Sequence, residues 1–329
     1  MNFVLVIEIL KNSRIITYMR YFFLTVVILI IGFYLHENWS EVKNIPYPNF
    51  HWLILLCLIV PLPFLVNGWL HYHVLKHFGL ILPFKEWFGL SVMNTFMNYA
   101  LPFQGGIGFR SIYLKTKYDF KFSLFISLLT IVNVIIGLTN TITGLLCALM
   151  LKNNIPYRHF SIIVVIFCFV LFCICGLFLV TPLVPVFKSK TFQWINRWKT
   201  GWNSLKHDYP LILRLFIFSL MNMIITSGML YSAFHSINID VGFKESMLVN
   251  VLVAFSLIFN LTPGAVGISE GIIGYGSSIL GYNASSGIVA SVILRFFILF
   301  WVFILGSIFG FTLFRSSSDK FRALKDEIR

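Results

Sequence analysis

Long apolar stretches alternate with short charged ones along the chain. Six of the stretches that lack Asp, Glu, Lys and Arg are long enough to cross the ~30 Å hydrocarbon core of a bilayer as an α-helix. Because proline lacks the backbone N–H that a helix needs, Pro61 and Pro63 should kink the second of these helices. The six full spans are expected at about residues 17–35, 50–75, 122–150, 160–181, 211–235 and 287–314.

Two other apolar regions are too short or too interrupted to be ordinary spans. Region 87–121 is broken at 101–106 by Leu-Pro-Phe-Gln-Gly-Gly, and region 245–281 is broken at 260–264 by Asn-Leu-Thr-Pro-Gly. Each arm of the second region has about 16 residues, or ~24 Å of helix, which is shorter than the ~30 Å core. We therefore predict two pairs of half-helices, each entering and leaving the membrane on one side.

Composition supports a membrane protein and excludes several other classes. Of the 329 residues, 58% are hydrophobic and only 11% are charged, whereas soluble domains have about 25% charged residues. A soluble enzyme could not bury this much apolar surface, and a disordered chain would not contain it. The solid apolar stretches also differ from the alternating strands of an outer-membrane barrel. The expected fold is an all-α, polytopic transmembrane bundle.

Basic residues predict the orientation of this bundle. If region 87–121 is re-entrant and six helices span the membrane, 20 of the 25 Lys and Arg residues lie on one side, which is then the cytoplasmic side. Both termini would be cytoplasmic, in an inner (plasma) membrane. The net charge of +13 then reflects orientation and contact with anionic lipid headgroups. No nucleic-acid partner is expected.

The two broken regions resemble each other. In the first, Asn98 and Pro102 precede Gly106; in the second, Asn260 and Pro263-Gly264 precede Gly267. We interpret them as equivalent parts of an inverted repeat in one membrane domain, with halves 1–155 and 156–314 and a basic cytoplasmic tail at 315–329. Interrupted helices that meet near the midplane are typical of transporters, and the substrate binds where they meet. The alternative is that they are two unrelated Pro-Gly loops.

Three ionisable residues lie deep within apolar regions: Arg110, Glu270 and Arg295. Charges there cost roughly 2.5–3.5 kcal/mol each on insertion scales, so they are expected to be paired or functional. Arginine binds phosphate bidentately, so Arg110 and Arg295 are candidates for a lipid phosphate. Glu270 would neutralise an arginine between substrates or contact a cationic headgroup. Helix N-termini at Gly106 and Gly267 would add backbone donors. The alternative is a structural ion pair between Glu270 and Arg295.

Neither a metal nor an organic cofactor is expected. The five cysteines lie in apolar runs without metal-site spacing, and His71, His73 and His77 have no carboxylate near them in the sequence. Paired acid/base carboxylates and Mg²⁺-binding aspartate clusters are missing from the apolar regions. We therefore do not expect an enzyme.

The motifs around Asn98 and Asn260, followed by Arg295 and an aromatic-rich last helix, resemble the lysylphosphatidylglycerol synthase transmembrane-region family. The similarity covers residues of about 50 to 314. One departure is Ile107, since the family usually has an acidic residue directly after the glycine of the first motif. The synthases also carry a soluble aminoacyl-transferase domain after the membrane part, whereas some 15 residues follow the last predicted helix here.

The resemblance implies flippase-like movement of a membrane lipid between leaflets, without aminoacylation by this polypeptide. The expected substrate is an anionic phospholipid or a polyprenyl-phosphate-linked lipid. The substrate site would comprise the residues of the two motifs and the three ionisable groups. The alternative is an accessory subunit or enzyme of envelope-lipid or glycan modification, and separately encoded enzymes of those processes are candidate partners.

Overall fold

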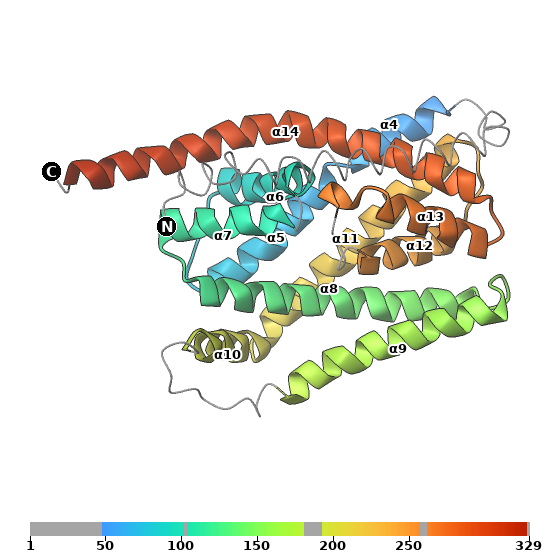
Figure 1. Cartoon of the computed structure of the whole chain (residues 1–329), viewed down its shortest axis with the longest axis horizontal. Helices are drawn as coiled ribbons and strands as arrows, with labels where there is room; N and C mark the ends of the chain where they lie inside the picture. Colours follow the sequence, from blue (N-terminus) through green and yellow to red (C-terminus); the bar gives the residue numbers. More distant parts are fainter. Residues whose placement is uncertain (1–47, 102–103, 181–192, 257–261, 328–329) are drawn as a thin grey trace.

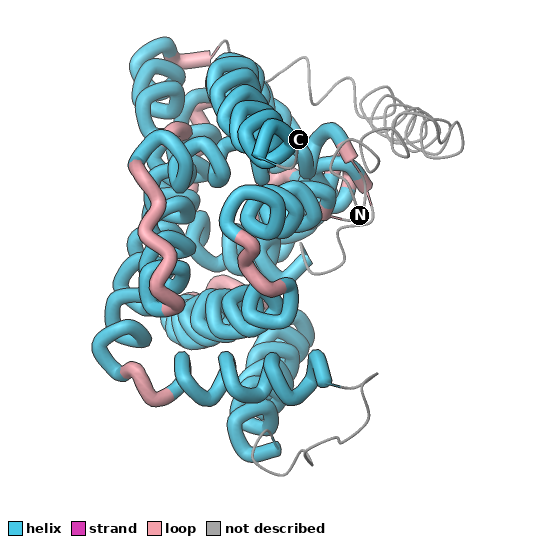
Figure 2. The backbone as a smooth tube through the Cα atoms, turned by 90° about the vertical axis from the view of Figure 1, so that its left-hand side faces the viewer, coloured by secondary structure: helices cyan, strands magenta, loops and turns pink. Residues whose placement is uncertain are grey.

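The computed structural model describes residues 48–101, 104–180, 193–256 and 262–327, and these residues form helices and loops without any strand (Figures 1 and 2). The predicted helix at 17–35 lies outside the described residues. The helices are α4 (Phe50–Ile59), α5 (Leu62–His77), α6 (Phe84–Ala100), α7 (Gly105–Tyr118), α8 (Phe122–Met150), α9 (Tyr157–Val180), α10 (Gln193–Lys206), α11 (Tyr209–Ser236), α12 (Phe243–Ser256), the 3₁₀ turn η4 (Pro263–Ala265), α13 (Ile268–Ile279) and α14 (Ala284–Glu327).

Five helical segments of the described chain are long and apolar enough to cross a membrane. They are Phe50–His77, Phe122–Met150, Tyr157–Gly176, Tyr209–Ser236 and Ala284–Leu313. These segments coincide with the five predicted spans that fall within the described residues. Helix α14 continues to Glu327, so most of the segment expected as a separate tail extends the last helix.

Helices α4 and α5 are separated at Val60 and Pro61, where a kink is predicted. Because Pro61 has no backbone N–H, it cannot bond to the carbonyl of Cys57 four residues earlier. That carbonyl instead accepts a hydrogen bond of 2.8 Å from Nε1 of Trp301 on α14. The helix is therefore interrupted at Val60 and Pro61, and a neighbouring helix bonds the carbonyl that the proline leaves free; the bend itself stays a prediction.

The broken regions form two helical hairpins that open toward opposite ends of the bundle (Figure 1). We call these ends the His77 end, where α5 ends and α8 begins, and the Met150 end, where α8 ends. Hairpin α6–α7 opens toward the His77 end, on the left of Figure 1, and hairpin α12–α13 opens toward the Met150 end.

A polar cluster closes the open end of the α6–α7 hairpin. Glu86, in the first turn of α6, forms an ion pair of 2.8 Å with Lys117 Nζ and accepts a hydrogen bond of 2.5 Å from the Tyr118 hydroxyl. Burial, this hydrogen bond and the Glu86 charge together raise the pKa of Tyr118. These contacts fix the start of α6 beside the end of α7.

The helix α10 packs against small hydroxyl side chains of α8. The Ser127 hydroxyl donates to the Trp198 carbonyl at 2.9 Å, and the Trp198 indole donates to the Thr130 hydroxyl at 3.1 Å. Trp202 is fully buried in the apolar core that α5, α6, α7, α8 and α11 share at this end. Helix α10 was not predicted from the sequence.

Candidate functional site

The tip of the α12–α13 hairpin is a tight turn. Gly264 has φ +63°, in the left-handed region that glycine adopts without strain, and Ala265 follows with φ +53°. The Thr262 hydroxyl closes the turn with a hydrogen bond of 2.9 Å to the Val266 carbonyl. This turn directly precedes α13, so the Pro263-Gly264 motif marks the start of the second arm of the hairpin. Asn260, predicted to be part of the same site, lies outside the described residues.

Glu270 caps the N-terminus of its own helix. It is 3% exposed, and its Oε2 accepts hydrogen bonds from Gly267 N at 2.7 Å and from the Ser269 hydroxyl at 3.2 Å. A carboxylate in the first turn also interacts favourably with the helix dipole. The Gly267 N–H, which we expected to be available to a ligand, is therefore already bonded within the chain.

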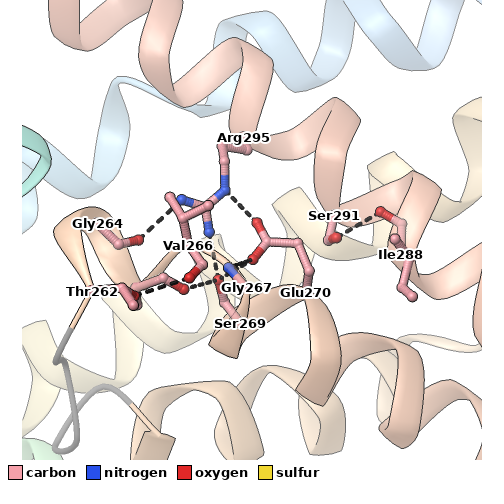
Figure 3. Close-up of polar contacts among 10 residues, drawn as sticks. Thr262, Gly264, Val266, Gly267, Ser269, Glu270, Ile288, Ser291 and Arg295 are labelled. Carbon is pink, nitrogen blue, oxygen red and sulfur yellow. Dashed lines mark hydrogen bonds and ion pairs between the residues drawn. The ribbon is translucent and has the colours of Figure 1, made fainter. Parts of the chain in front are cut away.

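Arg295, on α14, points into this turn (Figure 3). Its Nε forms an ion pair with Glu270 Oε1, one terminal nitrogen donates to the Gly264 carbonyl at 3.0 Å, and the other donates to the Ser269 hydroxyl at 2.5 Å. The charges of Arg295 and Glu270 thus neutralise each other and join α14 to α13. Ser269 was not among the residues predicted from the sequence.

The tip of the α6–α7 hairpin has a different cap. Asn98, near the end of α6, accepts a hydrogen bond of 2.9 Å through Oδ1 from the Gly106 N–H. Gly106 also lies so close to α6 that a Cβ there would overlap the backbone carbonyl of Asn94. The spacing of Asn98 and Gly106 is therefore explained by a close turn and its cap. Pro102 lies outside the described residues.

The two hairpin tips meet at Tyr99. A Cβ on Gly264 would overlap the Tyr99 ring, and the guanidinium carbon of Arg295 lies 5.8 Å from the centre of the same ring. Tyr99 thus links the breaks that the sequence motifs predicted separately. Tyr99 was not among the residues predicted from the sequence, although it directly follows Asn98 of the first motif.

Arg110 lies apart from the pair formed by Glu270 and Arg295. It is on α7, only 4% exposed, and its guanidinium forms no hydrogen bond or ion pair with any described residue; its buried Nε in particular lacks a partner. The structure therefore brings Glu270 and Arg295 together but leaves Arg110 as a separate buried cation.

The histidines of α5 are engaged separately. His77 contacts Asp208 Oδ2 at 2.7 Å and the Ser204 hydroxyl at 2.8 Å, whereas Nδ1 of His73 bonds to the backbone of its own helix. Within the described part of the chain, no group of three or more His, Cys, Asp or Glu side chains is arranged to hold a metal ion.

The helices and their composition define a multi-pass α-helical membrane protein. The chain belongs to the family described as the lysylphosphatidylglycerol synthase TM region, whose model matches residues 21–306. Membership implies a membrane protein of lipid modification or transport. No curated protein matches the chain.

Proposed function

We propose that this protein is a flippase-like transporter that moves an anionic phospholipid or a polyprenyl-phosphate-linked lipid between membrane leaflets. The observation that carries this proposal is the buried Arg110 guanidinium, which has no partner among the described residues. The membrane-lipid family supports the same substrate class.

An unpaired cation in the interior of a membrane protein is costly. On insertion scales an arginine costs roughly 2.5–3.5 kcal/mol at the membrane centre, unless it is paired or in contact with water. A lipid phosphate would compensate this cost, because the planar guanidinium can donate two parallel hydrogen bonds to it. We assign Arg110 as the primary phosphate-binding residue and Arg295 as a second one that Glu270 neutralises between substrates.

The arrangement of the hairpins supports transport. Hairpins α6–α7 and α12–α13 open toward opposite ends of the bundle, and their tips meet at Tyr99 and Gly264. We interpret them as re-entrant pairs of an inverted repeat with halves 1–155 and 156–314. In such transporters the binding site lies where the interrupted helices meet and opens alternately to each side. The protein would then act without enzymatic chemistry.

The charge distribution supports an orientation for this transporter. The His77 end carries basic residues of α7 and α10, including Lys115, Lys117 and Arg197. By the positive-inside rule this end faces the cytoplasm, and the membrane is the inner (plasma) membrane.

The decisive test compares stability with transport in the Arg110→Met variant. The purified protein is reconstituted into vesicles, and transbilayer movement of a fluorescent anionic phospholipid is followed. If Arg110 binds phosphate, Arg110→Met abolishes movement, while the melting temperature in detergent stays equal or rises, because a buried unpaired charge has been removed. A residue needed for folding would instead lower the melting temperature.

Arg214→Met is the matched control. Arg214 is an exposed arginine on α11, and its replacement is expected to change neither transport nor stability. Normal lipid movement by Arg110→Met, or equal loss of movement in both variants, would contradict the proposal.

A further inference from the structure

A row of polar side chains crosses the middle of the bundle on α5, α11 and α12. Asn67 Nδ2 donates to Asn222 Oδ1 at 3.2 Å. Asn250 Nδ2 donates to the Thr226 hydroxyl at 2.9 Å and to the Ser227 hydroxyl at 3.1 Å. Since Thr226 lies one helical turn after Asn222 on α11, these bonds form a continuous series. We call these five residues the polar row.

The polar row leads from the half of the bundle that holds Arg110 toward the Met150 end. His71, one turn after Asn67 on α5, bonds through Nδ1 to the Asn67 carbonyl at 2.7 Å. Leu70 and Val74 of α5 pack in the same apolar core as Phe109, the residue before Arg110 on α7. On α12, Ser246 lies one turn before Asn250, toward the Met150 end, and its buried hydroxyl has no hydrogen-bond partner among the described residues. The row therefore begins on a helix that shares an apolar core with α7 and extends into the opposite half of the bundle.

In each of the three asparagine amides of the polar row, only one of the two polar atoms forms a hydrogen bond. Asn67 Oδ1, Asn222 Nδ2 and Asn250 Oδ1 form no hydrogen bond with any described residue, and the three asparagines are half-buried. Accessible polar atoms at membrane depth are costly unless water or a ligand bonds to them. The free atoms are two acceptors and one donor, which suit hydroxyl groups, because a hydroxyl both donates and accepts.

We propose that the polar row is a binding subsite for the hydroxyl groups of a lipid headgroup, such as a glycerol or a sugar, while Arg110 holds the phosphate. This inference rests on the proposed function and specifies its substrate class. Because the amides are neutral, they distinguish headgroups by hydroxyls and not by charge. A phospholipid whose phosphate carries a plain alkyl group is then a poorer substrate than one whose phosphate carries a polyol.

The test uses two fluorescent lipids in reconstituted vesicles, phosphatidylglycerol and phosphatidylpropanol. They have the same tails and the same single negative charge, and they differ only by the headgroup hydroxyls. The wild-type protein is expected to move phosphatidylglycerol about fivefold faster, which corresponds to about 1 kcal/mol. Asn222→Leu and Asn250→Leu each reduce the phosphatidylglycerol rate toward that of phosphatidylpropanol and leave the phosphatidylpropanol rate within about twofold of wild type.

The ratio of the two rates separates this role from helix packing. If the row only joins helices, the leucine variants slow both lipids equally and the ratio stays unchanged, which would overturn the inference, as would a wild-type protein without preference. Ser232→Ala is the matched control, because this α11 hydroxyl bonds only to the Gly228 carbonyl of its own helix, at 2.8 Å; its ratio should equal that of wild type. Transport of both lipids by Arg110→Met would instead contradict the proposed function itself.

Discussion

Tyr99 and Gly264 come from different halves of the chain and touch where the two hairpin tips meet. Any side chain at position 264 would overlap the Tyr99 ring, and its backbone already has φ +63°. The contact therefore depends on glycine, and it brings the α6–α7 hairpin directly against the turn that Arg295 holds.

Replacing Gly264 should loosen this contact. We expect Gly264→Ala to lower the free energy of unfolding by about 1–3 kcal/mol, the usual cost of overpacking, and to reduce lipid movement. Gly271→Ala is the control, since a Cβ on this α13 residue would meet nothing within 4 Å. Melting temperatures in detergent measure the effect, and equal values for the two variants would contradict it.

A second glycine pair tests the α6–α7 tip. A Cβ at Gly106 would overlap the Asn94 carbonyl, whereas one at Gly108 would meet nothing within 4 Å. Because a backbone atom cannot rotate aside, Gly106→Ala should separate α6 from α7 and break the hydrogen bond that the Gly106 N–H donates to Asn98 Oδ1. We expect the melting temperature to fall clearly for Gly106→Ala and to fall little or rise for Gly108→Ala. The opposite order would show that the helices do not approach this closely.

Glu270 and Arg295 can be tested as a pair. Arg295→Ala leaves the Glu270 carboxylate buried without its partner. This should lower the free energy of unfolding by about 3–5 kcal/mol. The double variant Glu270→Ala/Arg295→Ala removes both charges and should recover most of the lost stability. If Arg295 also binds lipid phosphate, the double variant remains stable but transports slowly. A double variant that transports normally would exclude a phosphate-binding role for Arg295.

The raised pKa of the Tyr118 hydroxyl predicts that the folded protein loses stability at alkaline pH. This pKa is raised above the ordinary value of 10 by burial and by the hydrogen bond to Glu86, so the folded state holds this proton more tightly than the unfolded state. The stabilisation is complete below about pH 10 and is lost as the pH rises through the folded-state pKa. Melting temperatures measured as the pH is raised past about 10 should fall more steeply for wild type than for Tyr118→Phe. Identical pH profiles would contradict this assignment.

Cysteine labelling tests the orientation of the bundle. In a variant without the five native cysteines, Lys115→Cys is exposed near the His77 end, and Asn153→Cys is exposed in the loop after α8 at the Met150 end. A membrane-impermeant thiol reagent applied to intact cells should label only Asn153→Cys. Labelling of Lys115→Cys from outside would show that hairpin α6–α7 opens to the exterior.

The long helices and the two breaks could be predicted because apolar length and Pro-Gly interruptions are local properties of the chain. Helix α10 was missed, since its 14 residues contain no apolar run and its Trp202 is buried only through contact with other helices. The partner of His77 was missed for a similar reason: Asp208 lies 131 residues further along the chain.

The site was predicted only in part. The motifs located Gly106 and Gly267, but not that Asn98 and Glu270 already occupy their N–H groups. The ion pair of Glu270 and Arg295 was one of two interpretations that the sequence left open, the other being phosphate binding. Whether a charged side chain such as Arg110 is paired depends on how several helices pack together. A local sequence pattern does not determine that packing.

Arg295 also determines how the hairpins can separate. Its single planar group holds the Pro263–Ala265 turn through the Gly264 carbonyl, the start of α13 through Ser269 and Glu270, and the tip of α6 through the Tyr99 ring. Because these partners all contact one rigid guanidinium, a rotation of that group that breaks one interaction also misaligns the others. Opening of the tips should therefore be cooperative, with two discrete states separated by a barrier and no stable half-open form.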